Sequence, residues 1–317
     1  MSKKLLYFTV VILFFVMMSS GCQLNNTVAK VNEVEIQSDE LNKQMVLTEI
    51  SYTMNGYEIP TGEEYKKLQL EMLNNMVEDV ILLDLAKGRD IISDEETARS
   101  QGESIIQSII DSYGSEEDYE NYLRDHHQSR VDFEEYIMTL SQTNQMIYAL
   151  YDAISKDVVI TNTQLQNYYE ENQLYYSNST VSIMNITLDN EDTAQKLYEK
   201  IHSESVKMED VLKQPDQWEG VEEAEELEEI YYGDMEDVFS NFVFEMKTGD
   251  VSEPFMVNDE YHIVSLYDKD IQKPIPFETI KDTVNEHLLT KRRTEIYNEY
   301  LQEQKVNYQM KLYPDRL

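Results

Sequence analysis

Cysteine is almost absent from this chain of 317 residues, which contains a single one, Cys22. Without a second thiol no disulfide can form within the chain, and zinc sites built from several cysteines are excluded. The stability of the fold must therefore come from buried apolar side chains. A chain of this length can form the cores of two domains.

Basic residues are also scarce, since 26 Lys and Arg stand against 62 Asp and Glu, which gives a net charge of −36. Nucleic acid is not expected as a partner, because its recognition requires clustered Lys and Arg. Glycine and proline number only 9 and 6, which favours long helices, whereas tyrosine is abundant, with 23 residues. Exposed tyrosines suit a surface that holds varied polypeptides; drift in surface composition is the alternative explanation.

The first 22 residues have the order of an export signal. Lys3 and Lys4 precede an apolar run at 5–18, and the small residues 19–21 come directly before Cys22. This order is typical of a signal peptide, and the run is short for a transmembrane helix, which needs about 20 apolar residues. The position of the cysteine resembles the lipobox of bacterial lipoproteins, although a serine replaces the usual leucine three residues before it.

The lipobox resemblance implies cleavage before Cys22 and a diacylglycerol on its thiol. The rest of the chain is then expected to lie on the extracytoplasmic face of the cell membrane, anchored by this lipid. An ordinary signal peptide with a chance cysteine and a retained N-terminal anchor are the alternatives.

Apolar residues recur at helical spacing from residue 37 to residue 175, which predicts an all-helical block. A short strand is expected just before it, at residues 28–32. Within the block, Thr161 is expected to cap a helix.

The pattern changes in the middle of the chain. Residues 180–188 alternate and are β-rich, residues 193–202 are helical, and two further strands are expected at 251–257 and 261–267. The acidic run at 219–229 is interpreted as a solvated loop or helix face.

A last helix is predicted from residue 277 to about residue 304, followed by a strand at 306–312. Its apolar face needs a partner, and the N-terminal block is the obvious one. The predicted class is therefore α+β: a mostly helical body, an inserted small α+β unit and a returning C-terminal helix.

Residues 233–264 carry the most informative local pattern. Met235 and Phe239 are four residues apart, so on a helix they share one face. Pro254 marks an extended segment, because the residue before a proline avoids the helical conformation, and His262 lies on the strand that follows. A strand histidine opposite an apolar helix face forms a pocket suited to a proline ring.

Three segments resemble the extracytoplasmic parvulin-type foldases, the PrsA and SurA family. Residues 28–32 are similar to the start of their chaperone domain, and residues 159–172 to the helix that precedes their parvulin domain. Residues 233–264 are similar to the second half of that parvulin domain.

This resemblance implies four parts. They are a lipoprotein signal peptide at 1–21, a SurA-N-like helical chaperone domain at 22–175, a parvulin-like peptidyl-prolyl isomerase domain at 176–270, and a C-terminal helix at 271–317 that packs on the N-terminal domain. Prolyl isomerisation needs no cofactor, so none is expected.

The same resemblance implies the roles of the site residues. Met235, Phe239 and Phe244 would bind the substrate, and His262 with Asn185 would form the catalytic polar network. The family usually has a histidine where this chain has Asn185, and an asparagine cannot take a proton at neutral pH. The central Cys or Asp of the family has no clear match, and its Gly-Gly-x-Leu-Gly loop is missing. Packing that only maintains the fold is the alternative role for these residues.

No metal site is predicted. His126 and His127 are adjacent, and adjacent side chains do not face each other on a helix, so a solvated surface is expected. The acidic residues 222–229 lack the spaced Asp and Gly pattern of a calcium loop. No Ser-His-Asp motif is present either.

Three functions follow as hypotheses. The first is a membrane-anchored foldase that assists newly exported, unfolded polypeptides and isomerises their X-Pro bonds, with reduced activity. The second is a holdase without catalysis, whose parvulin domain is structural or binds peptides. The third is a solute-binding lipoprotein, which would need two α/β lobes. Dimerisation through the helical body is left open.

Overall fold

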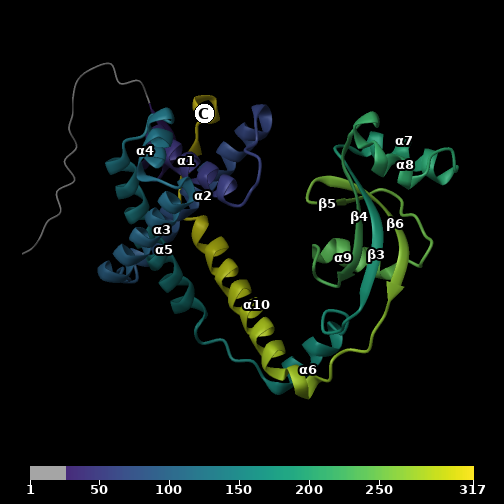
Figure 1. Ribbon diagram of the computed structural model, residues 1–317. Helices are drawn as coiled ribbons and strands as arrows, with labels where there is room; N and C mark the ends of the chain where they lie inside the picture. Colours follow the sequence, from purple (N-terminus) through teal and green to yellow (C-terminus); the bar gives the residue numbers. More distant parts are fainter. Residues whose placement is uncertain (1–25) are drawn as a thin grey trace, which may run out of the picture. The chain divides into compact units, whose positions relative to one another are not determined.

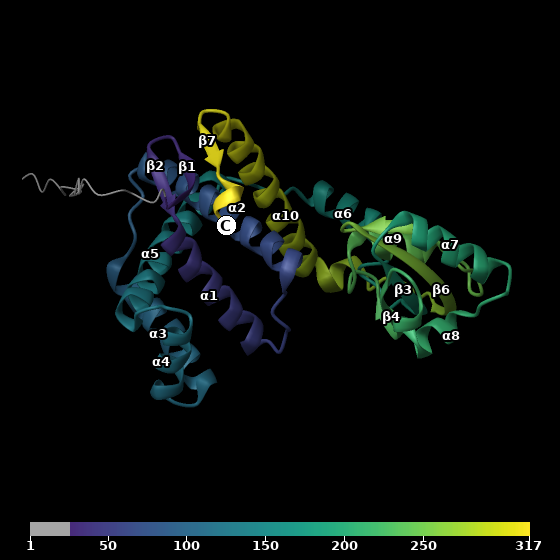
Figure 2. The same ribbon diagram turned by 90° about the horizontal axis from the view of Figure 1, so that it is seen from above.

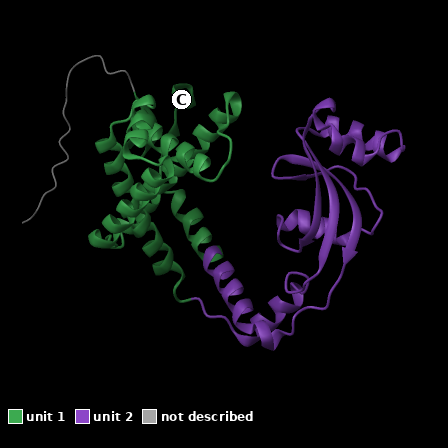
Figure 3. Cartoon of the chain, viewed as in Figure 1, with its two compact units in different colours: residues 1–157, 295–317 green, residues 158–294 purple. Residues whose placement is uncertain are grey.

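The structure is a computed structural model, and it describes residues 26–317. It confirms the α+β class, with helices in one part of the chain and a four-stranded antiparallel sheet in another (Figure 1). The chain forms two compact units, coloured separately in Figure 3. We call residues 26–157 with 295–317 the helical unit and residues 158–294 the sheet unit. Cys22 and the leader lie outside the described residues.

The helical unit is built mainly from α1 (Ser38–Met54), α2 (Gly62–Lys87), α3 (Glu95–Tyr113), α4 (Glu116–Asp125) and α5 (Arg130–Ser155). Apolar residues at helical spacing line one face of each helix and meet in shared cores. One such core joins α1, α3, α4 and α5 through Val46, Ile50, Ile106, Ile109, Ile110, Tyr119, Leu123, Phe133 and Ile137.

A small sheet joins the two ends of the helical unit. β1 (Thr27–Val31) lies between β2 (Val34–Gln37) and β7 (Met310–Leu312), and both pairings are antiparallel. Figure 2 shows β7 beside β1 and β2. The last strand is shorter than the predicted 306–312, because only its final residues pair with β1, and Val306 is 82% exposed.

The sheet unit contains β3 (Thr180–Leu188), β4 (Val221–Tyr231), β5 (Phe255–Val257) and β6 (Glu260–Asp270). Their order is β4-β3-β6-β5, and every neighbouring pair is antiparallel. A strand is predicted at residues 251–257. Only its last three residues form β5, and Val251 makes an isolated bridge with Ser265.

Both faces of this sheet are covered by helices. α9 (Asp237–Glu245) packs on one face, in a core of Val181, Ile183, Phe239, Val243, Phe244, Val257, Val264 and Leu266. α7 (Glu191–His202) and α8 (Met208–Lys213) pack on the other, in a core of Ile186, Leu188, Ala194, Leu197, Ile201, Met208, Val211 and Ile263. The division follows from the pleat of β3, whose successive side chains point to opposite faces.

The prediction of a solvated loop or helix face for residues 219–229 is wrong, because most of this run forms β4. Leu227 and Ile230 pack against the α9 core, whereas Val221 and Ala224 pack against the α7 core. Six glutamates accompany these residues and remain at least partly exposed on an edge strand. Charged side chains on an edge strand prevent pairing with other chains. A high glutamate content is therefore compatible with a strand at this position, although it obscures the apolar pattern in the sequence.

Two helices complete the sheet unit. Thr161 caps α6 (Asn162–Glu171) with a complete capping box, and α10 (Phe277–Lys305) begins in this unit and ends in the helical unit. In the sheet unit the two helices share a core of Leu165, Tyr169, Tyr176, Val284 and Leu288. In the helical unit Leu301 of α10 packs with Leu82, Ala86, Met146 and Leu150. The sequence had placed α6 with the helical block, whereas it belongs to the compact sheet unit.

One sequence hypothesis, the solute-binding lipoprotein, can be compared with this architecture. The described residues form a helical unit and a unit with a single four-stranded antiparallel sheet, which are not the two α/β lobes that a solute-binding lipoprotein needs. Within residues 26–317, none of the helices has both the length and the apolar character that crossing a bilayer requires.

Candidate active site

The face of the sheet that α9 covers also carries a polar pair. His262 on β6 and Asn185 on β3 are 8% and 3% exposed, and the His262 Nδ1 lies 3.2 Å from the Asn185 Oδ1. The register aligns Asn185 with Val264 and Thr187 with His262, so the two polar residues are diagonal neighbours on adjacent strands. The structure therefore brings together the two residues expected to form the catalytic network.

The hydrogen bonds of this pair have a direction. An amide oxygen can only accept, so the His262 Nδ1 carries the proton and donates it to Asn185. The amide nitrogen of Asn185 in turn donates to the Thr187 hydroxyl, at 3.4 Å. The other ring nitrogen of His262 is then an acceptor.

Glu225 extends the network, and the sequence did not identify it. It lies directly opposite Asn185 on β4, and a hydrogen bond from Asn185 stabilises its carboxylate. The net effect of the surroundings is nevertheless a raised pKa of Glu225, because burial and the neighbouring Glu223 both disfavour the charge. The signal that could have revealed it is the acidic run, which was interpreted as a solvated loop or helix face and which forms a strand beside β3.

Burial also determines the charge of the histidine. Removal from water lowers the pKa of His262 below its ordinary value of 6.5, since the imidazolium is harder to bury than the imidazole. The ring is therefore neutral at pH 7, which agrees with its role as donor at one nitrogen and acceptor at the other.

Aromatic rings surround the imidazole. Phe239 meets His262 edge to face, with centroids 5.3 Å apart, and Phe255 lies 5.8 Å from the same ring. Phe255 also stacks on Phe242, with centroids 4.1 Å apart. The sequence identified Phe239 but missed the other two, although Phe255 directly follows Pro254 and Phe242 lies one helical turn after Phe239.

Met235 does not share a helix face with Phe239, which corrects the sequence argument. The helix begins at Asp237, and Glu236 is its N-cap, so Met235 lies in the preceding turn. The positive φ of Gly233, +94°, forms this turn, and a glycine accommodates such a value at low cost. Met235 still packs against the α9 core that contains Phe239.

Phe244 occupies the far end of the same core. It is 6% exposed, and its ring meets Tyr232 edge to face, with centroids 5.1 Å apart. The backbone carbonyl of Phe244 accepts a hydrogen bond from the Lys269 ammonium. These contacts tie α9 to β6 and to the end of β4.

Of the two adjacent histidines, His127 has the expected solvated position, whereas His126 does not. His126 is only partly exposed, and its Nε2 lies 3.2 Å from a carboxylate oxygen of the buried Glu49, which also accepts a hydrogen bond from Tyr65. His127 has a positive φ of +56° at the end of α4 and is exposed. In the part of the chain that the structure describes, no group of three or more His, Cys, Asp or Glu side chains is placed to hold a metal ion.

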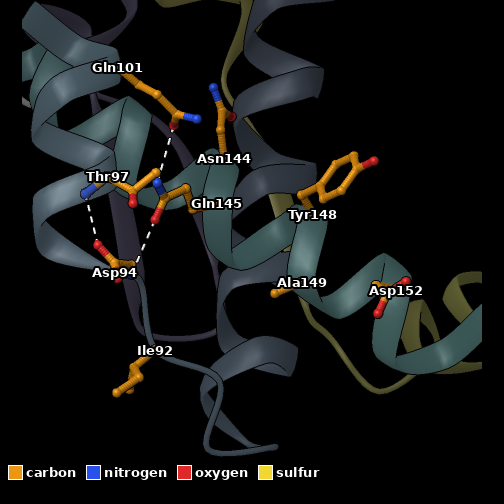
Figure 4. Close-up of a pocket in the computed structure, with 9 residues that line it drawn as sticks. All are labelled: Ile92, Asp94, Thr97, Gln101, Asn144, Gln145, Tyr148, Ala149 and Asp152. Atoms are coloured by element: carbon orange, nitrogen blue, oxygen red, sulfur yellow. Dashed lines mark hydrogen bonds between the residues drawn. The ribbon is translucent and has the colours of Figure 1, made fainter. Parts of the chain in front are cut away.

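The helical unit contains a wide hollow of about 660 Å³ between the start of α3 and the second half of α5 (Figure 4). Gln145 spans it, accepting from the backbone N–H of Asp94 and donating to Gln101. Tyr148 and Ile92 at its rim are 75% and 85% exposed.

Comparison with known proteins identifies both units. A family model described as "SurA-like N-terminal domain" matches residues 2–147, and one described as "PPIC-type PPIASE domain" matches residues 160–282. The chain is 25% identical over 306 residues to a "Foldase protein PrsA" of Clostridium botulinum strain Langeland, covering 92% of this chain and 89% of that protein. A "Foldase protein PrsA" of Clostridium perfringens strain 13 is 28% identical over 185 residues, which cover 55% of this chain and 54% of the relative.

Among solved structures, the peptidyl-prolyl isomerase PrsA of Bacillus anthracis aligns with 74% of this chain and 97% of its own, with 18% identity and a TM-score of 0.36. The two family models and the fold define the class: a chaperone that combines a SurA-like domain with a PPIC-type peptidyl-prolyl isomerase domain. Within that class, the chain carries both of these domains and is similar along 92% of its length to a protein named "Foldase protein PrsA".

Proposed function

We propose that the sheet unit catalyses cis–trans isomerisation of X-Pro bonds in unfolded, exported polypeptides, outside the cytoplasm. The observation that carries this proposal is the neutral His262, hydrogen-bonded to Asn185 and enclosed by Phe239 and Phe255. Aromatic rings beside a buried polar pair supply the apolar contact that a proline ring needs and the polar group that its preceding carbonyl needs.

The mechanism requires no nucleophile and no proton transfer to the substrate. Rotation about a peptide bond is slow because amide resonance creates a barrier of about 18–20 kcal/mol. The planar amide is more dipolar than the twisted one, since resonance places negative charge on its oxygen. An aromatic pocket that removes water from this oxygen therefore favours the twisted transition state over the planar ground state.

The role proposed for the polar network is to position the imidazole. Asn185 fixes the proton on the His262 Nδ1, and Thr187 and Glu225 orient the amide of Asn185. This leaves the His262 Nε2 as a neutral acceptor on a ring that Phe239 and Phe255 contact. Asn185 cannot titrate, so activity is expected to be lower than in relatives with a histidine there.

The experiment is a proline-peptide isomerisation assay on the mature protein. Wild type is expected to accelerate isomerisation, His262→Ala to lower kcat/KM, and Asn185→His to raise it. A wild-type rate equal to that of buffer would reject catalysis, and rescue by Asn185→His would then assign the loss to this one position.

A second candidate is a holdase without catalysis. The observation that favours it is that His262, Asn185 and Thr187 already satisfy one another, which is also what a purely structural network would do. Delayed aggregation of an unfolded client by the His262→Ala variant, at the level of wild type, would establish the holdase independently of isomerisation.

The anchor is the last part of the proposal: a lipid on Cys22 would hold the foldase at the outer face of the membrane. The support is the sequence of the leader, which lies outside the described residues. Mass spectrometry of membrane-extracted protein is expected to find a diacylglycerol at Cys22. The Cys22→Ser variant is expected to leave the membrane fraction.

A further inference from the structure

The helical unit also contains a smaller cavity of about 160 Å³, distinct from the hollow at α3. It lies among β2, α1, α2 and α5, and most of its wall is apolar, formed by Ile36, Met76, Val80, Leu83 and Leu140. An apolar cavity of about 150 Å³ is large enough to hold a group the size of benzene. The cavity can therefore accept one long side chain, and Val34, 52% exposed, lies at its rim.

Three carboxylates line the same cavity, and one of them differs from the others. Glu35 accepts hydrogen bonds from Thr27 and Gln37, and Glu40 accepts one from the backbone N–H of Gln37. Asp79 receives no hydrogen bond from any group within residues 26–317. Burial, and secondarily the neighbouring Glu78, raises the pKa of Asp79 to about 6.

No positive charge compensates these carboxylates inside the cavity. Its lining contains neither lysine nor arginine among the described residues, and Lys305 is paired with Glu78, at 2.7 Å. Tyr136 also lines it; its hydroxyl donates to Gln44, which leaves the face of its ring as the aromatic part of the wall. Aromatic faces attract cations.

We propose that this cavity binds a lysine or arginine side chain of an unfolded polypeptide. The alkyl stem would lie against the apolar wall and the charged end would pair with Asp79. The inference rests on the proposed function, because it supplies a polypeptide contact on the helical unit for the substrate that the sheet unit isomerises. Charge complementarity selects this occupant over an uncharged apolar side chain, which would leave Asp79 unpaired.

Pairing with a cation would hold Asp79 ionised, so binding is coupled to pH. The charged and titratable groups around Asp79 come from five elements: Glu35, Glu40, Glu78, Tyr136, Tyr297 and Lys305. Asp79 and the three glutamates all favour a bound cation, and the two tyrosines are neutral at these pH values. Affinity is expected to fall as the pH decreases from 7 to 5.

The test uses the mature full-length protein and a fluorescent, proline-free peptide of alternating leucine and lysine. Fluorescence anisotropy is expected to show about tenfold weaker binding for Asp79→Asn and for the peptide with acetylated lysines, since either change removes one charged partner of the ionic hydrogen bond. The two changes together should weaken binding no further than either one. Glu71→Gln, which removes an exposed carboxylate from the same helix, should bind like wild type.

Three outcomes would overturn the proposal. They are unchanged binding by Asp79→Asn, equal binding of the acetylated peptide, and self-association that Asp79→Asn abolishes while no peptide binds, which would assign the cavity to a second copy of the chain. If Asp79→Asn does not fold, as judged by circular dichroism, the acetylated peptide still decides the question. A proline-free probe separates this result from the isomerase assay, so either can fail alone.

Discussion

His262 is buried as a neutral ring, and this has a consequence for stability. Protonation is favoured more in the unfolded chain, with a pKa near 6.5, than in the fold, where the pKa is lower. The contribution of His262 is therefore complete above pH 6.5 and is lost as the pH falls through 6.5 toward the folded value.

Urea unfolding at several pH values measures this effect. The free energy of unfolding of wild type should fall relative to that of His262→Gln as the pH decreases from 7 to 5, because only wild type has the titrating group. Parallel pH curves for the two proteins would contradict the burial of His262.

Glu225 is the residue whose role sequence reasoning could not assign. Because its carboxylate accepts a hydrogen bond from Asn185, Glu225→Gln should loosen the positioning of the polar pair. We expect kcat/KM for a proline peptide to fall by about threefold to tenfold, since hydrogen bonds to charged groups contribute about 1.5–3 kcal/mol when fully formed and this one is partly exposed.

The matched control is Glu228→Gln, which removes an exposed carboxylate from the same strand. It should leave kcat/KM unchanged, whereas equal losses in both variants would indicate a general effect of strand charge. NMR titration measures the pKa of His262 in Glu225→Gln. If the reaction is slower while this pKa is unchanged, Glu225 acts by positioning the polar pair and not through its charge.

At the scale of elements, the turn that leads into β4 is held by a glycine. Gly220 has a φ of +75°, and a Cβ added there would lie 2.5 Å from the Asp189 Oδ1 and 2.6 Å from the Thr193 Oγ1. Gly220→Ala combines backbone strain with these contacts, so it is expected to destabilise the sheet unit by about 2–3 kcal/mol.

Gly249 provides the control, because its φ is +95° but no atom lies within 4 Å of an added Cβ. Gly249→Ala should therefore cost only the strain, about 1 kcal/mol. The free energy of unfolding in urea distinguishes the two variants. Equal losses would mean that the contacts at Gly220 relax without cost.

The elements also show what sequence reasoning could and could not predict. Periodicity predicted the helical block and β3, because apolar side chains recur there without competition from charge. It missed β4, where glutamates outnumber the four apolar residues that face the cores. It also placed Met235 on a helix that begins two residues later, since the turn depends on the backbone of Gly233.

The candidate site was predictable only in part, for a related reason. His262 and Phe239 lie in segments with recognisable patterns, but their partners depend on which strands become neighbours. The position of Glu225 opposite Asn185 is a property of the β3–β4 register, and no local pattern encodes that pairing.

At the scale of the whole molecule, the net charge of −36 opposes compact folding through self-repulsion. Raising NaCl from about 20 mM to about 300 mM at pH 7 should raise the thermal midpoint by about 2–4 °C, because salt shortens the range of the repulsion. Near pH 4.3, where the chain is close to its pI, the same salt step should have little effect. A midpoint that falls with salt at pH 7 would contradict net repulsion.

The small sheet of the helical unit has a consequence for the order of events during export. β1 takes its second neighbour, β7, from residues that follow the entire sheet unit in the chain. If the N-terminus crosses the membrane first, residues 158–294 have emerged before the final strand that closes the helical unit becomes accessible. The sheet unit can then fold first, whereas the helical unit can complete its small sheet only after the C-terminal segment has crossed the membrane.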